Sequence, residues 1–140
     1  MSKKILIVVS NYYKEISKNL LKGTTDTLKN LEYSFDTINV RGSFEIPFVI
    51  NRNIKLYSGF VALGCIIRGE TYHFELISNE VTRKIIDLSI DFNKPIGFGI
   101  ITCDNIEQAR SRSSIEKNAS VINKGQEAAL AVTQIFDNYL

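Results

Sequence analysis

The clearest candidate for chemistry is the stretch GCIIRGETYHFE, residues 64–75, in which an apolar run ends and the only histidine of the chain follows. A histidine has an unperturbed pKa of about 6.5, which suits His73 to moving protons near neutral pH. Gly69 lets the backbone approach a ligand closely, and the amides that open a following helix can hold an anion. The pattern favours proton transfer beside an anion site. The alternative is an ordinary strand-to-helix turn in which Thr71 caps the helix.

Aromatic and acidic side chains follow two other apolar runs. Tyr12 and Tyr13 could stack on a planar ring, or pack as half-buried aromatics on the next helix. The stretch GSFEIP adds Phe44 as another aromatic and Glu45 as a carboxylate at a helix start. The helix dipole alone favours a carboxylate there by about 0.3–1 kcal/mol. Glu45 therefore needs no function, although it could accept hydrogen bonds from the N–H groups of a heterocycle.

The remaining reactive side chains give weaker signals. Arg110 and Arg112 lie two residues apart, so on a helix one can reach a phosphate while the other is solvated. Cys65 lies in an apolar run, which is typical of a small buried hydrophobe rather than a nucleophile. Cys65 and Cys103 match no metal spacing. We therefore expect reduced thiols, no structural metal and a cytoplasmic location.

Short apolar, β-branched runs alternate along the chain with segments of helical periodicity. Strands are predicted at residues 4–10, 35–40, 59–67 and 95–102, and helices at 15–31, 44–56, 74–92, 104–113 and 123–140. Asp104 and Glu107 predict a capping box for the fourth helix. This alternation is typical of a parallel sheet covered on both faces. We predict an α/β fold, a flavodoxin-like three-layer α/β/α sandwich with a four-stranded parallel sheet.

Ligands of such sheets bind outside the carboxyl ends of the strands. The segments SNYY, RGSFE, IIRGETYH and TCDN each follow a predicted strand and therefore lie at that edge. His73, Tyr12 and Glu45 are expected to meet there.

Composition limits the remaining function classes. A chain of 140 residues with 44% hydrophobic residues predicts one domain, residues 1–140, with a sizeable core. The net charge is only +2 and no run of five basic residues occurs, so neither nucleic acid nor a membrane surface is expected as a partner. No apolar stretch reaches the ~20 residues of a membrane helix. The beginning, MSKKILIVVS, continues with polar Asn11 rather than a cleavage site, which favours a first strand over a signal peptide.

Several motifs in one order resemble the lumazine synthase family, the 6,7-dimethyl-8-ribityllumazine synthases of riboflavin biosynthesis. They are VRGSFEIP, ALGCIIRGETYHFE, NEV, KPIGFGIITCDNIEQA and NKGQEAAL, and they span nearly the whole chain. The resemblance implies a transferase that condenses 5-amino-6-(ribitylamino)uracil with 3,4-dihydroxy-2-butanone 4-phosphate and releases phosphate and water. It implies neither a metal nor a redox cofactor.

The resemblance also implies roles for particular residues. His73 matches the proton-transfer histidine, and Tyr12 matches an aromatic residue that stacks on the pyrimidine. Uracil and ribityl contacts are implied for the loop and strand-end positions Ser43, Phe44, Glu45, Cys65, Ile66 and Ile67. Phosphate contacts are implied for Glu70 and Thr71. Residues that enter from the neighbouring subunit are implied at Phe98, Arg112 and Lys124, with Arg112 pairing with the phosphate.

Three features depart from the family pattern. Tyr13 stands where many members have asparagine, and Arg41 replaces a proline. The stretch SSIEKNASVIN, residues 113–123, is longer than in shell-forming members and lacks their glycine. Because the family's common unit is a pentamer, we expect a free homopentamer whose long links keep pentamers apart, with riboflavin synthase as a candidate partner.

Two alternatives to the enzyme remain open. The chain could be a flavin- or pteridine-binding module that keeps the pocket without turnover. It could also be an assembly protein in which the fold serves as a building block. The presence of both His73 and Arg112 favours the enzyme, because a pure building block would need neither.

Overall fold

A computed structural model describes residues 3–140, so the first two residues of the predicted domain lie outside it. Strands and helices alternate along the chain as the sequence predicts. In chain order they are β1 (Lys4–Ser10), α1 (Lys14–Asn30), β2 (Ser34–Val40), the 3₁₀ helix η1 (Ser43–Glu45), α2 (Ile46–Arg52), β3 (Gly59–Ile67), α3 (His73–Phe92), β4 (Ile96–Cys103), α4 (Ile106–Arg112) and α5 (Lys124–Tyr139).

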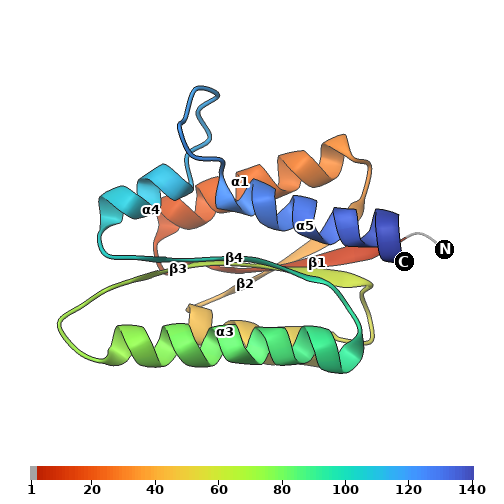
Figure 1. Ribbon diagram of the computed structural model, residues 1–140, viewed down its shortest axis with the longest axis horizontal. Coiled ribbons are helices and arrows are strands. Elements are labelled where there is room, and N and C mark those ends of the chain that lie inside the picture. Colours follow the sequence, from red (N-terminus) through yellow and green to blue (C-terminus); the bar gives the residue numbers. More distant parts are fainter. Residues whose placement is uncertain (1–2) are drawn as a thin grey trace.

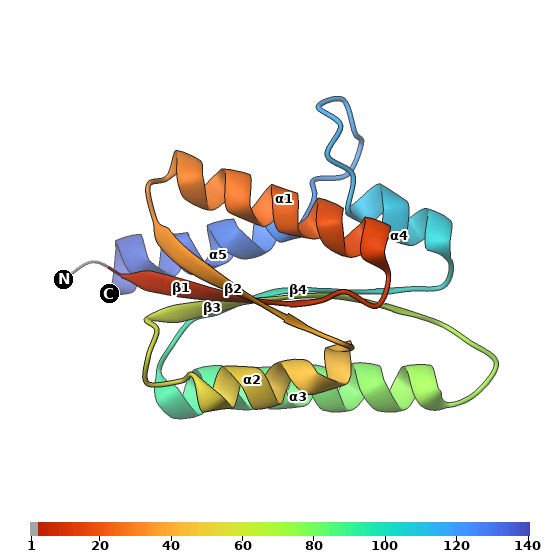
Figure 2. The same cartoon turned by 180° about the vertical axis from the view of Figure 1, so that it is seen from behind.

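The four strands form one parallel sheet in the order β2-β1-β3-β4. Helices α1, α4 and α5 cover one face, and α2 and α3 cover the other (Figures 1 and 2). The predicted three-layer α/β architecture is therefore confirmed. β2 lies on one side of β1 and β3 lies on the other, so the strand order reverses direction at β1. A ligand is therefore expected in the crevice between the ends of β1 and β3.

The central strands are buried on both faces, which explains why their sequences read as continuous apolar runs. In β1, Ile5, Ile7 and Val9 pack in the core under α1 and α5, whereas Leu6 and Val8 pack in the core above α2 and α3. The strand alternation thus fixes which helix layer each side chain meets.

The helix predicted over residues 44–56 is wrong at both ends. Residues 43–45 form the 3₁₀ turn, and α2 covers only Ile46–Arg52. Pro47 lies in the first turn of α2, where its missing N–H costs no helical hydrogen bond. At the other end the Asn53 side chain donates to the carbonyl of Val49 at 2.8 Å, a local bond that competes with continuation of the helix.

The capping box predicted from Asp104 and Glu107 is also wrong, by one residue. Asn105 is the N-cap of α4, and its Oδ1 accepts from the backbone N–H of Gln108 at 2.9 Å. The Gln108 side chain accepts in turn from the backbone N–H of Asp104 at 2.7 Å. Asparagine is at least as good an N-cap as aspartate, so Asn105 can take the cap position although Asp104 comes one residue earlier.

The link between α4 and α5, residues 113–123, projects away from the helical layer (Figures 1 and 2). The buried side chain of Asn123 closes its base. Its Nδ2 donates to the carbonyls of Asn19 at 3.0 Å and Ser113 at 2.9 Å, and its Oδ1 caps α5. The cap lies so close to α1 that a Cβ at Gly23 would stand 2.1 Å from Asn123 Oδ1.

Candidate active site

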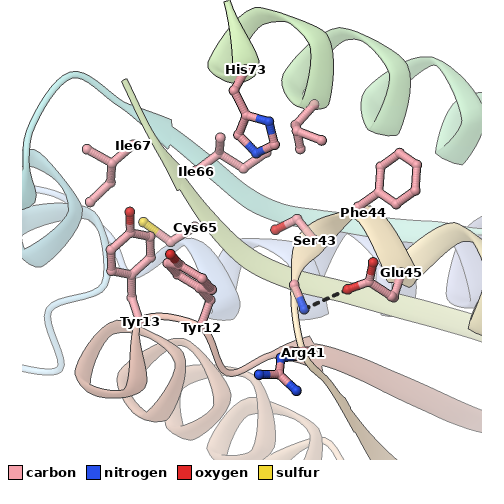
Figure 3. Close-up of a pocket in the computed structure, with 12 residues that line it drawn as sticks. Tyr12, Tyr13, Arg41, Ser43, Phe44, Glu45, Cys65, Ile66, Ile67 and His73 are labelled. Atoms are coloured by element: carbon pink, nitrogen blue, oxygen red, sulfur yellow. Dashed lines mark hydrogen bonds between the residues drawn. The ribbon is translucent and has the colours of Figure 1, made fainter. Parts of the chain in front are cut away.

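A cavity of about 620 Å³ opens at the carboxyl edge of the sheet, in the crevice between β1 and β3 (Figure 3). It straddles the end of β3, because Cys65 belongs to the core on one face and Ile66 to the core on the other. Its lining consists of Tyr12, Tyr13, Arg41, Gly42, Ser43, Phe44, Glu45, Cys65, Ile66, Ile67, His73 and Ile77.

Each of the two tyrosines that follow β1 fits a different one of the two expected roles, packing on the core or stacking on a ligand. Tyr13 is half-buried and packs against the core, and burial beside Cys65 raises the pKa of its phenol. Tyr12 is 70% exposed and meets Tyr13 edge to face, with ring centroids 5.0 Å apart and planes at 72°. This contact is the favoured geometry for an aromatic pair. Tyr13 thus holds the ring of Tyr12, which remains largely exposed and can meet a planar ligand.

The turn after β2 brings a serine, a phenylalanine and a glutamate to the opposite wall. The Glu45 carboxylate accepts from the backbone N–H of Gly42 at 2.9 Å, which fixes the turn. Phe44 is 64% exposed at the rim. Ser43 is buried, and its Oγ has no hydrogen-bond partner among residues 3–140. A buried hydroxyl without a partner costs ~1–3 kcal/mol, so a polar ligand group in the cavity would relieve this cost.

The end of β3 supplies the apolar wall through Cys65, Ile66 and Ile67. Burial, together with nearby Cys103, raises the pKa of Cys65 from 9.0 to about 12. The thiol therefore stays protonated, and both cysteines are free and buried. These observations fit the predicted role of Cys65 as a small hydrophobe, because the thiolate is the nucleophilic form.

His73 is the first residue of α3, and its ring lies in the cavity across from the tyrosines (Figure 3). The N-cap is Tyr72, so the alternative with Thr71 at that position is wrong, although Thr71 Oγ1 accepts from the His73 backbone N–H at 3.3 Å. Ile77, one helical turn after His73, also lines the cavity. Residues four apart lie on the same face of a helix, so the sequence could have placed Ile77 beside His73, but the predicted site leaves it out.

Five of the residues implied by the resemblance do not line this cavity. Glu70 and Thr71 are exposed in the turn between β3 and α3. Phe98 is 42% exposed on β4, which is an edge strand. The Arg112 guanidinium donates to the carbonyl of Thr102 at 3.1 Å and to Cys103 Sγ at 3.3 Å. Lys124 pairs with a glutamate of its own helix.

Residues 3–140 contain neither a cluster of metal ligands nor a helix that could span a membrane. No three His, Cys, Asp or Glu side chains in this range gather as a metal-ligand set. No helix in the same range has the length and apolar character needed to cross a bilayer.

Comparison with known proteins places the chain in a family. A sequence model described as 6,7-dimethyl-8-ribityllumazine synthase matches residues 2–139. Proteins of that name from Bartonella tribocorum and Kosmotoga olearia are 46% and 41% identical, over 91% and 94% of this chain and 83% and 85% of their own lengths. A solved structure described as a putative LacI-family transcription repressor from Corynebacterium glutamicum has a TM-score of 0.49 at 10% identity, covering 96% of this chain and 91% of its own.

The family match extends over nearly the whole chain, and it agrees with the resemblance carried by the motifs around residues 40–47 and 62–75. The chain belongs to the 6,7-dimethyl-8-ribityllumazine synthase family.

Proposed function

We propose that the protein is a 6,7-dimethyl-8-ribityllumazine synthase. It condenses 5-amino-6-(ribitylamino)uracil with 3,4-dihydroxy-2-butanone 4-phosphate in riboflavin biosynthesis. The observation that carries the proposal is the meeting of His73, Tyr12 and Ser43 in one cavity (Figure 3). A proton carrier, a free aromatic face and an unpaired buried hydroxyl together suit a polar heterocycle that must lose and gain protons.

The uracil substrate is bound between the tyrosine pair and the turn after β2. Tyr12 stacks on the pyrimidine with its exposed face. Ser43 Oγ, which lacks a partner in the free protein, takes a hydrogen bond from or gives one to the ligand. Glu45 uses one carboxylate oxygen for the Gly42 N–H and keeps the other for ligand N–H groups. Contacts with the ring and the ribityl chain extend to Phe44, Cys65, Ile66 and Ile67.

His73 moves the protons of the reaction. The substrate amine and ketone form a Schiff base, phosphate leaves, and the ring closes with loss of water. Each step needs a proton removed from nitrogen or carbon or delivered to a leaving oxygen, and an imidazole can do both. Such proton transfer contributes typically ~10²–10⁴-fold, whereas holding two reactants in register is worth up to ~7–11 kcal/mol. Positioning is therefore the larger part of the proposed catalysis.

The phosphate of the second substrate binds at the turn between β3 and α3. Glu70 and Thr71 belong to this turn, and it leads directly into the N-terminus of α3, where backbone amides favour an anion. Arg112 of an adjacent subunit supplies the cation. A charge-assisted hydrogen bond from a guanidinium is well suited to a phosphate oxygen.

The positions of three residues support the proposal of a site shared between subunits. Phe98, Arg112 and Lys124 lie on β4, α4 and α5 and do not reach the cavity of their own chain. At the start of β4, an edge strand of the described sheet, the exposed side chains of Ile90, Ile135 and Tyr139 line a hollow together with Ile96. An exposed strand edge with apolar flanks needs to be covered. We propose a homopentamer that covers this edge and completes each site.

The pentamer is proposed to be free rather than part of a shell. The link of residues 113–123 projects from the helical layer, where it would obstruct contact between pentamers (Figure 1). The two buried free thiols fit a reducing compartment, which supports a cytoplasmic location. Riboflavin synthase is a candidate partner because it acts next in the proposed pathway.

The deciding experiment mixes the purified protein with both substrates and follows lumazine absorbance. Omission of either substrate is the control and should abolish the signal. Binding of the uracil substrate without product would favour the binding-module alternative. Absence of both binding and product would favour the assembly protein.

A further inference from the structure

Arg68, the residue that follows β3, makes four contacts with two other segments. Its Nε donates to Asp104 Oδ1 at 2.9 Å, and its Nη1 donates to Glu75 Oε1 at 2.7 Å. The guanidinium carbon lies 4.6 Å from the ring centroid of Phe74. The backbone N–H of Arg68 donates to the carbonyl of Cys103 at 2.8 Å. One side chain thus joins the start of α3 to the connection between β4 and α4. We call this arrangement the Arg68 clamp.

The segment that the clamp holds has little support of its own. Residues 69–73 are exposed, and a Cβ at Gly69 would meet no heavy atom within 4 Å. Phe74 and Glu75 follow His73 directly in the first turn of α3. The clamp therefore holds the chain at Arg68, before His73, and at Phe74 and Glu75, directly after it. Phe74 and Ile77 anchor the first turns of α3 on the core, and the clamp adds the contacts that tie the segment carrying the His73 imidazole to the β4–α4 connection.

The other arm of the clamp reaches the segment that leads to Arg112. Asp104 is linked to the start of α4 through the Gln108 side chain at 2.7 Å, and Arg112 is the last residue of that helix. Arg68 thus connects the turn of its own proposed site to the helix that carries the proposed phosphate ligand of the next site.

The clamp also has an electrostatic consequence. Glu75 and Asp104 are acidic side chains beside the turn where the phosphate is proposed to bind, and they are 44% and 63% exposed. Unpaired, they would repel a phosphate dianion. The Arg68 guanidinium faces both carboxylates, and hydrogen bonds to Asp104 and Glu75 raise its pKa, so it stays charged. Both carboxylates are therefore hydrogen-bonded to a cation, and the single charge of Arg68 reduces the repulsion that the pair would exert on a phosphate.

We propose that Arg68 is a positioning residue for the reaction, which holds His73 and the phosphate-binding turn against the β4–α4 connection and screens two carboxylates from the phosphate. Its role in turnover rests on the function proposed above. The clamp itself rests on the contacts described here. Arg68 touches neither the cavity lining nor, in this scheme, the reacting atoms.

The chain offers a matched control in Arg83. This arginine also pairs with two carboxylates, those of Glu80 at 2.8 Å and Asp87 at 3.3 Å, but all three lie along the exposed face of α3. Arg68→Ala and Arg83→Ala remove the same charge and the same number of ion pairs. Only Arg68→Ala releases the turn.

The first measurement is hydrogen–deuterium exchange without substrates. Arg68→Ala should speed exchange in residues 69–77, whereas Arg83→Ala should leave that segment unchanged, because local opening reports lost contacts. Equal exchange of this segment in the two variants would overturn the clamp. This arm does not depend on activity, so it remains decisive even if the wild-type protein forms no lumazine and the proposed function fails.

The second measurement separates positioning from a folding defect. Arg68→Ala should lower kcat/KM for the butanone phosphate about tenfold, within the ~10²-fold that a 1 Å misplacement can cost, and should change the KM for the uracil substrate much less. Arg68→Lys should restore the KM for the phosphate substrate, since the charge remains, but not kcat, since lysine lacks the planar fork. Equal losses for both substrates, or kinetics matching Arg83→Ala, would overturn the positioning role.

Discussion

The Ser43 hydroxyl lies directly over Gly64 of β3, so that a Cβ added at Gly64 would stand 2.5 Å from Ser43 Oγ. The other neighbours of that Cβ are at ordinary contact distances, 3.4 Å for Ser10 Cβ and 3.6 Å for Ile46 Cδ1. The missing side chain of Gly64 therefore provides the space that the Ser43 hydroxyl occupies, and Ser43 lines the cavity.

Gly64→Ala should weaken binding of the uracil substrate while leaving the fold intact. The new methyl group displaces Ser43 Oγ, which can rotate, but meets no backbone atom that would have to move. Calorimetric titration should show the loss, and it should be much smaller when Gly64→Ala is made in a Ser43→Ala background, because coupled residues are not additive. Equal losses of binding affinity in both backgrounds would show that Gly64→Ala does not act through the Ser43 hydroxyl.

His73→Ala should lower kcat by about 10²-fold or somewhat less, because proton transfer is one contribution among several. Binding of both substrates should largely survive. Ile77→Ala, one turn further along α3, is the matched control, since it alters the same cavity without removing a proton carrier. Steady-state turnover equal to the wild type would remove His73 from the mechanism.

Arg112→Ala should raise the KM for the phosphate substrate far more than the KM for the uracil substrate, since only the former carries the matching charge. Inorganic phosphate should compete with that substrate in the wild type and lose this effect in the variant. Arg110→Ala is the control, because Arg110 pairs with Glu15 at 3.4 Å instead. Equal changes for both substrates would point to a general structural defect.

The buried thiol of Cys65 should make the protein less stable at alkaline pH. Its pKa is raised from 9.0 to about 12 on folding, so above about pH 9 the unfolded chain loses a proton that the folded chain retains. Stability from this group is complete below that pH and declines through the window up to about 12, by at most ~1.4 kcal/mol per pH unit. Urea unfolding should show a flatter decline for Cys65→Ala. Parallel curves would contradict the raised pKa.

Light scattering should give a particle of about five chain masses, the closed ring proposed here. Co-assembly of His73→Ala with Arg112→Ala should give higher activity than either variant alone, because some mixed sites take an intact histidine from one chain and an intact arginine from the next. A particle of about sixty chain masses would overturn the argument from the projecting link. A stable, active monomer would overturn the shared site.

The strands were the most predictable part of the fold, and the reason is burial. In β1 and β3 every buried position except Ser10 is apolar, so the sequence alone marks the ends of these strands to within a residue. Helix ends were less predictable because single side chains decide them. Asn105 takes the cap that Asp104 could have taken, and Asn53 stops α2 early.

The candidate site was predictable where strand ends carry it. Tyr12, Ser43 and His73 follow three different strands and meet in one cavity, as parallel topology requires. Gly42 was missed because a glycine has no side chain that indicates a lining role, and Ile77 was missed although it lies one helical turn after His73. The pattern of the chain left Arg110 and Arg112 as equal candidates to reach a phosphate. Only the family resemblance singled out Arg112, whose proposed place depends on a neighbouring subunit.

The closed base of the 113–123 link has an evolutionary consequence. Asn123 ties the two ends of the link to each other and to α1, and the residues between them contribute nothing to the cavity. Insertions and deletions in this stretch can therefore accumulate without disturbing either the fold or the chemistry. For the proposed pentamers, selection can then change how the particles associate while the residues that line the cavity stay the same.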